Sequence, residues 1–142
     1  MTMNATVNWV KDAMFLAESG SGHTVVMDGP PEYGGANLAA RPMEMILMGL
    51  GGCAIFDVVK MLKKGRQDIR DCRVELVAER AQGVPSPFTQ IEMVFIATGV
   101  KLKDAQVKRA VELSAEKYCS ASIMLEAAGV VLTHSYKVIN VE

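Results

Sequence analysis

Residues 42–64 read PMEMILMGLGGCAIFDVVKMLKK, and this stretch decides the fold of the chain. Pro42 suits the first position of a helix, because the N–H that proline lacks has no helical partner there. Lys63 and Lys64 suit the last turn, where cations meet the negative end of the helix dipole. Gly65 then supplies a typical stop. The pattern predicts one long helix over residues 42–64.

The predicted helix is apolar nearly all round as far as Asp57. Its charge-free run, residues 45–56, has twelve residues, whereas a bilayer span needs roughly 20. We therefore expect a buried helix with protein on both of its faces. One small sheet in a chain of 142 residues covers only one face. We expect a second copy of the chain to cover the other face, so that the protein is a homodimer.

Three glycines precede Cys53 within this helix: Gly49, Gly51 and Gly52. Each costs up to about 1 kcal/mol of helix stability relative to alanine. Because such a cost needs a compensating gain, we expect another segment to pack very close to the helix just before Cys53.

The sequence on both sides of the helix reads as strands, turns and shorter helices. Alternating apolar residues predict strands over residues 3–9, 13–18, 23–28, 72–81, 88–98 and 130–138, with an antiparallel hairpin turning at residues 82–87. Residues 29–40 form a Gly- and Pro-rich loop, long enough to suggest a functional role. Two further helices are expected over residues 103–118 and in a short segment that begins at a Ser120 or Ser122 cap and ends at Gly129. This order predicts an α+β fold in a single domain, residues 1–142.

The composition excludes several classes of protein. Half of the residues are hydrophobic, 22% are charged and the formal net charge is −1. This balance is typical of a globular domain rather than a disordered chain. No surplus of basic residues exists to neutralise phosphates, so we expect neither nucleic-acid binding nor membrane binding. The N-terminal residues lack a basic segment followed by an apolar one, so we expect a cytoplasmic protein without a secretory signal.

Common cofactor and metal motifs are also missing. The glycines of the central helix do not follow the dinucleotide-binding pattern, and no phosphate-binding loop or Cys-x-x-Cys pair occurs. His23 and His134 stand alone, without metal-ligand spacing to each other or to a pair of cysteines. We expect no metal and no cofactor.

The three cysteines do not form a disulfide framework of the secreted kind, because their number is odd. Cys72 begins a strand between two charged residues, and we interpret it as structural. Cys53 lies in the apolar helix, a position typical of a buried structural thiol. Cys119 lies at the junction of two predicted helices. The helix dipole there favours a thiolate, so we expect a lowered pKa and a reactive thiol.

Two segments resemble the OsmC/Ohr superfamily, the osmotically induced and organic-hydroperoxide-resistance proteins. Residues 41–53, RPMEMILMGLGGC, are similar to its cysteine helix, which runs from a proline and acidic residues to Ala/Gly-Cys. Residues 118–124, YCSASIM, followed by GVVL at 129–132, are similar to its second cysteine segment, Cys-Pro-x-Ser-x-x-Leu. The order of elements matches over essentially the whole chain. The Arg-Pro-Met-Glu start resembles the YhfA-like branch.

The resemblance implies an intertwined homodimer with a cysteine-based peroxidase activity toward organic hydroperoxides or hydrogen peroxide. Cys53 would attack the O–O bond and become a sulfenic acid. Cys119 would then resolve it as an internal disulfide, which an external dithiol reduces.

Two charged residues complete the implied site, Arg41 and Glu44. A peroxidatic thiolate needs a neighbouring cation, and Arg41 is the only arginine in the first 65 residues. Members of the superfamily have a glutamate directly after the proline, where this chain has Met43. Glu44, one residue later, precedes Cys53 by nine residues, about 13 Å of helix rise on the opposite face. We expect Glu44 to reach Cys53 only from a second copy of the chain, and Arg41 to reach it either from a second copy or through a folded-back loop.

Two alternatives to the peroxidase remain open. The ten methionines suit an adaptable apolar pocket, so the protein could instead be a non-catalytic dimer that binds a small hydrophobic ligand in a Met-lined pocket. A third reading is other thiol chemistry, such as acyl transfer by a Cys119–His134 pair.

Overall fold

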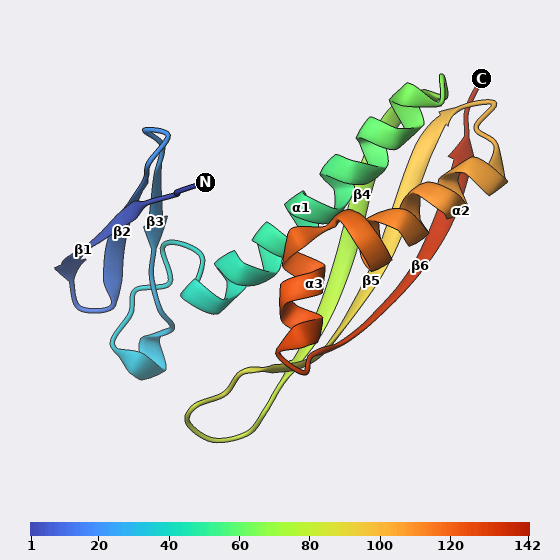
Figure 1. Cartoon of the computed structure of the whole chain (residues 1–142). Coiled ribbons are helices and arrows are strands. Elements are labelled where there is room, and N and C mark those ends of the chain that lie inside the picture. The colour runs from blue at the N-terminus through green and yellow to red at the C-terminus, as the bar shows by residue number, and fades with distance from the viewer. The chain divides into compact units, whose positions relative to one another are not determined.

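The computed structural model describes residues 1–142 and has the predicted order of elements (Figure 1). The chain is α+β and divides into two compact units, Met1–Ile46 and Leu47–Glu142. A single domain over the whole chain stays a prediction. The strands are β1 (Ala5–Lys11), β2 (Met14–Ser19), β3 (Thr24–Met27), β4 (Asp68–Arg80), β5 (Phe88–Val100) and β6 (Val131–Asn140), and the helices are α1 (Pro42–Lys64), α2 (Asp104–Leu113) and α3 (Ser120–Ala127).

The N-terminal unit is built on an antiparallel three-stranded sheet in the order β1-β2-β3. Trp9 pairs with Phe15, which in turn pairs with Met27, and these side chains share one face because residues directly opposite in a ladder point the same way. That face is apolar, yet Trp9 is 69% exposed. The largest side chain of this apolar face is therefore mostly exposed.

The loop between β3 and α1 is organised by a buried carboxylate. Asp28 is 1% exposed and accepts hydrogen bonds from the backbone N–H groups of Gly29, Ala36 and Leu38, at 2.7, 3.4 and 3.1 Å. These bonds favour the charged form and lower the pKa of Asp28. The loop over residues 29–40, for which the sequence suggested a functional role, is thus ordered by hydrogen bonds to the Asp28 carboxylate.

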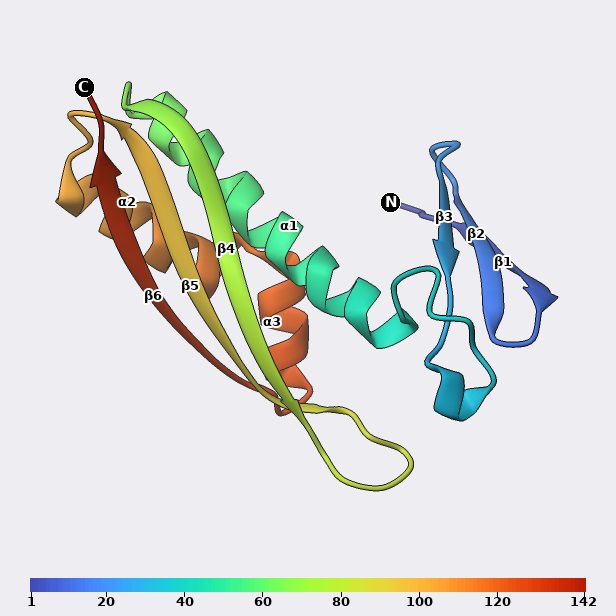
Figure 2. The ribbon, with the colours of Figure 1, turned by 180° about the vertical axis from the view of Figure 1, so that it is seen from behind.

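The C-terminal unit is a three-stranded sheet in the order β4-β5-β6, with its helices on one face (Figure 2). β4 and β5 form the predicted antiparallel hairpin, and β6 pairs in parallel with β5. The central strand β5 carries the core, with Ile91, Met93 and Phe95 almost fully buried under the helices. The covered face of this sheet therefore holds both cysteine-bearing elements, α1 and the segment before α3.

Helix α1 begins and ends where its sequence predicts, but its own chain covers only one of its faces. Leu50, Ala54, Val58 and Leu62 recur at helical spacing and are fully buried. Phe56, by contrast, is 67% exposed. By length and hydropathy α1 is also able to span a membrane, a property that core helices of soluble proteins share.

The glycines of α1 differ from one another. At Gly51 an added Cβ would lie 3.0 Å from Leu76 and 3.3 Å from Val74 of β4, so close packing on the sheet requires glycine. At Gly49 and Gly52 the same atom would meet nothing within 4 Å. The prediction of close packing before Cys53 is confirmed for Gly51 within the chain and not for the other two.

Several boundaries differ by one or two residues from those predicted, and two differ more. β4 begins at Asp68, four residues early, because a register irregularity between Ile69 and Asp71 interrupts the alternation there. The helix predicted over residues 103–118 changes character after Leu113 and becomes a single π-helical turn, Ser114–Tyr118. Such wide turns are uncommon and occur often at functional sites.

Candidate active site

Cys53 and Cys119 meet on the covered face of the C-terminal sheet. Cys53 is half-buried in α1, and Cys119 is fully buried between the π-helical turn and α3. Both cysteines are free, and the Cys53 thiol lies close enough to Cys119 to raise the pKa of Cys119. Two thiols from segments 66 residues apart in sequence (119 − 53) are therefore neighbours.

The π-helical turn positions Cys119 through Ser114. The Cys119 N–H donates to the Ser114 carbonyl at 2.9 Å, which closes the turn. The Ser114 hydroxyl donates to the Ala54 carbonyl of α1 at 2.8 Å, and Ser114 is completely buried. Ala54 follows Cys53 directly. One side chain thus fixes the backbone of both cysteine segments relative to each other.

Cys119 itself caps α3, so the predicted cap at Ser120 or Ser122 is wrong. Its sulfur accepts a hydrogen bond from the Ser122 N–H at 3.5 Å. A sulfur can take the capping place because its lone pairs meet the unpaired N–H groups of the first turn. The Ser122 hydroxyl is fully buried without a regular hydrogen-bond partner, and it lies close enough to Cys119 to favour the thiolate.

The pKa of Cys119 is raised, which is opposite to the direction predicted from its place at a helix start. Burial is the largest cause of the rise, and the two interactions with Ser122 lower the pKa without reversing the net shift. The neighbouring Cys53 raises the pKa of Cys119 further, chiefly through its side-chain interaction with the protonated thiol and to a smaller extent through charge repulsion. At neutral pH Cys119 is therefore a protonated thiol.

Cys72 lies on a different element, the strand β4. It is half-buried in β4 opposite Ala97 of β5, and it packs against the hydrophobic core. Burial, with a smaller contribution from the Asp71 carboxylate, raises the pKa of Cys72 to about 11. A thiol with this pKa is almost never ionised at neutral pH and is a poor nucleophile. These observations support the structural interpretation of Cys72.

Arg41 and Glu44 interact at the start of α1, in the N-terminal unit. The Glu44 carboxylate accepts a hydrogen bond from the Arg41 N–H at 2.9 Å. This is one half of a capping box, in which a glutamate in the first turn satisfies the backbone of the capping residue. The Arg41 guanidinium makes no ion pair or hydrogen bond within the chain, so its charge is available to another molecule.

His134 does not pair with Cys119. It lies on the covered face of β6, where its Nε2 is 3.9 Å from a Glu116 carboxylate oxygen of the π-helical turn. No hydrogen bond joins His134 to Cys119. The structure thus gives no geometric support to an acyl-transfer pair. No group of three His, Cys, Asp or Glu side chains is arranged to hold a metal ion.

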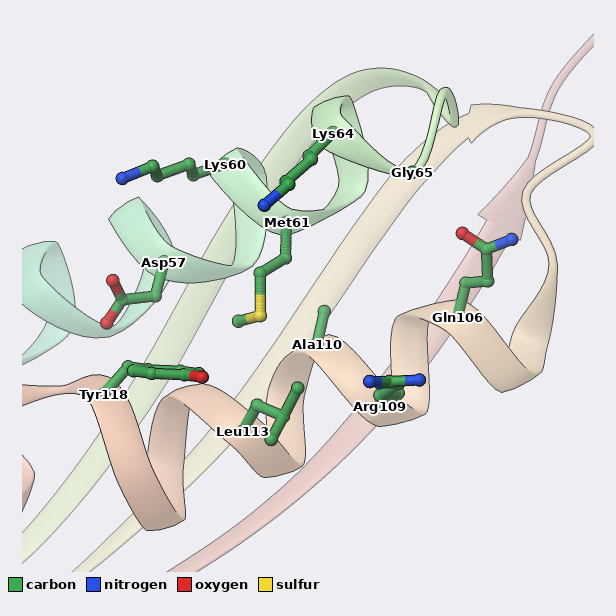
Figure 3. Close-up of a pocket in the computed structure, with 10 residues that line it drawn as sticks. All are labelled: Asp57, Lys60, Met61, Lys64, Gly65, Gln106, Arg109, Ala110, Leu113 and Tyr118. Carbon is green, nitrogen blue, oxygen red and sulfur yellow. The ribbon is translucent and has the colours of Figure 1, made fainter.

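A groove of about 720 Å³ runs along α1 beyond the cysteines (Figure 3). α1 contributes Asp57, Lys60, Met61 and Lys64, and the opposite wall is formed by α2 and the π-helical turn. The complete lining is Asp57, Lys60, Met61, Lys64, Gly65, Gln106, Arg109, Ala110, Leu113 and Tyr118. Only one methionine, Met61, lines the groove, so it is not the Met-lined pocket that the sequence suggested. Four of the lining side chains are charged.

Sequence reasoning missed Ser114, Ser122 and the cations of the groove. Ser122 does carry a signal, because it is the serine of the Cys-x-x-Ser spacing in the second cysteine segment. The sequence signal for Lys60 and Lys64 is weaker: residues four apart share a helix face, so two cations at this spacing lie side by side. Nothing in the sequence connects Ser114 with Ala54.

Known proteins match both the sequence and the fold. The family model described as OsmC-like protein matches residues 34–135. Protein YhfA of Escherichia coli strain K12 is 54% identical over 137 residues, which cover 96% of this chain and 98% of YhfA. A hypothetical protein from Aquifex aeolicus VF5 is 29% identical with a TM-score of 0.85, covering 100% of this chain and 99% of its own.

A more distant structure shares the fold. It is an organic hydroperoxide resistance protein OsmC from Legionella pneumophila, 16% identical with a TM-score of 0.71, covering 97% of this chain and 98% of its own. The match over residues 34–135 and the identity to YhfA decide the assignment. The chain belongs to the OsmC-like protein family.

Proposed function

We propose that this protein is a thiol-dependent peroxidase that reduces organic hydroperoxides or hydrogen peroxide. The observation that carries the proposal is the proximity of Cys53 and Cys119, two free thiols from separate elements. A paired dithiol supplies both electrons needed to cleave one O–O bond. Two solved structures with the same fold are named organic hydroperoxide resistance proteins. These names support a role connected with peroxides.

In the first step the Cys53 thiolate attacks the distal oxygen of the hydroperoxide. The S–O bond forms as the O–O bond breaks, the alkoxide leaves and takes up a proton, and Cys53 becomes a sulfenic acid. In the second step the Cys119 sulfur attacks that of Cys53. Hydroxide leaves and combines with the Cys119 proton as water, and a disulfide remains. An external dithiol then restores both thiols by exchange and is itself oxidised to a disulfide.

The surroundings of Cys119 suit this second role. Its raised pKa keeps it protonated until the sulfenic acid has formed, so it does not compete with Cys53 for peroxide. The Ser122 N–H and hydroxyl then favour the charge that develops as the proton leaves.

We further propose that two copies form a homodimer. Two open apolar surfaces support it: the face of the N-terminal sheet that carries Trp9, and the stripe of α1 that carries Gly52 and Phe56. Large uncovered apolar surfaces mark sites of association. In the dimer, Arg41 and Glu44 of one copy reach Cys53 of the other, and the Arg41 charge favours the thiolate and the departing oxygen. A cytoplasmic location agrees with three free thiols in one chain.

Peroxide consumption with dithiothreitol as reductant tests the proposal. The wild-type protein should consume cumene hydroperoxide catalytically, and Cys53→Ser should abolish the reaction. Cys119→Ser should still form the sulfenic acid, which dimedone traps, but should lose most of its turnover. Cys72→Ala is the matched control and should retain full activity. Consumption by the wild type at the rate of dithiothreitol alone would overturn the proposal in favour of a non-catalytic dimer that binds a small hydrophobic ligand.

A further inference from the structure

The groove between α1 and α2 gathers cations that have no partners. Lys60, Lys64 and Arg109 line it, and none of them forms an ion pair within the chain. Asp57 is the one carboxylate in the lining, so the lining carries three positive charges and one negative charge. Placing like charges around one hollow costs free energy that an anion would recover.

The walls between these charges are apolar. Met61 points from α1 toward Ala110 and Leu113 of α2 (Figure 3), and Ala110 is only 3% exposed. Tyr118 closes one end, with the Lys117 ammonium 5.4 Å from the centre of its ring. Pockets for small molecules typically combine such an apolar lining with a few polar groups, in volumes of about 300–1,000 Å³.

We propose that this groove binds a small amphiphilic organic anion, a carboxylate that carries a medium-length alkyl chain or an aromatic ring. Lys64 and Arg109 hold the carboxylate, and Arg109 offers the two parallel N–H groups that a carboxylate accepts best. The alkyl or aromatic part lies over Met61 and Leu113. A neutral analogue lacks the ionic contacts, and a cationic one is repelled.

The groove is distinct from the cysteine pair, because neither thiol lines it. It nevertheless begins one helical turn from Cys53, since Asp57 is four residues further along the same face of α1. The binding site is argued from its charges and shape alone and does not depend on peroxidase activity.

Calorimetric titration with octanoate, in the absence of peroxide, tests the proposal. The wild-type protein should bind octanoate at least about 10-fold more tightly than 1-octanol or octylammonium, a difference of about 1.4 kcal/mol or more. The double variant Lys64→Gln/Arg109→Gln should lose at least about 10-fold in affinity. The matched control, Arg73→Gln/Lys108→Gln, changes the net charge equally at exposed sites outside the groove and should bind as the wild type does.

A second measurement locates the ligand without any change of charge. The Met61 methyl signal, assigned with Met61→Leu in a methionine-labelled sample, should shift as octanoate is added. Equal loss of affinity in both double variants, equal binding of octanoate and 1-octanol, or an unchanged Met61 signal would overturn the proposal.

Discussion

Ser114 is the residue whose loss should loosen the cysteine pair without touching either thiol. Its hydroxyl holds the π-helical turn to the Ala54 carbonyl at 2.8 Å. In Ser114→Ala this buried hydrogen bond is absent, while the backbone bond from Cys119 to residue 114 remains possible. The Ala54 carbonyl lies inside α1 and keeps its helical N–H partner. The loss is therefore the net value of one hydrogen bond, about 1 kcal/mol, rather than the larger penalty for a wholly unpaired group.

This free energy should appear in two measurements. The free energy of unfolding in urea should fall by about 1 kcal/mol, with an unchanged denaturant slope. If that energy also holds Cys119 against Cys53, disulfide formation after one equivalent of peroxide should slow by up to about fivefold. Dimedone present during the reaction should then trap more of Cys53 as the sulfenic acid.

Ser120→Ala is the control, because Ser120 is exposed at the start of α3 and makes no side-chain hydrogen bond. It should change neither stability nor trapping. Ser114 has no such role if Ser114→Ala unfolds at the same urea concentration as the wild type and gives the same proportions of disulfide and trapped sulfenic acid.

Three further predictions concern individual side chains. Ser122→Ala should raise the pKa of Cys119 further, because the hydroxyl favours the thiolate; thiolate absorbance against pH, in a Cys53→Ser/Cys72→Ala background, measures it. Asp28→Asn should speed proteolysis of the loop at residues 29–40, and only the wild type should lose loop protection as the pH falls below 3.8, because folding lowers the pKa of Asp28 from that value. Folding raises the pKa of Cys72 from 9.0 to about 11. The contribution of Cys72 to stability is therefore complete below pH 9 and is lost as the pH rises through 11. The free energy of unfolding of Cys72→Ala should fall less steeply between these pH values than that of the wild type.

Local chemistry explains why the central helix was predictable. Pro42 acts through backbone geometry at its own position, so the start of α1 follows from the sequence alone. The helix also ends at the predicted residue, although the left-handed residue that follows it is Arg66 (φ 60°) and not Gly65. Glu44 satisfies the helix start in the same local way. The order of strands and helices follows from periodicity, and it was predicted correctly for the same reason.

The features that depend on distant contacts were not predictable. The hydrogen bond from Ser114 to Ala54 joins residues 60 positions apart, and no local pattern reports it. The pKa of Cys119 was predicted in the wrong direction because a helix start is visible in the sequence, whereas burial, the larger effect, is not. The groove cations belong to two helices whose relative placement only the fold establishes.

The most direct test of the peroxidase proposal is to map the cysteines after oxidation. One equivalent of cumene hydroperoxide is added to the fully reduced protein, and the remaining thiols are alkylated before digestion without reductant. The proposal predicts a single disulfide between Cys53 and Cys119, with Cys72 alkylated. A disulfide that contains Cys72, or three alkylated cysteines and unconsumed peroxide, would contradict it.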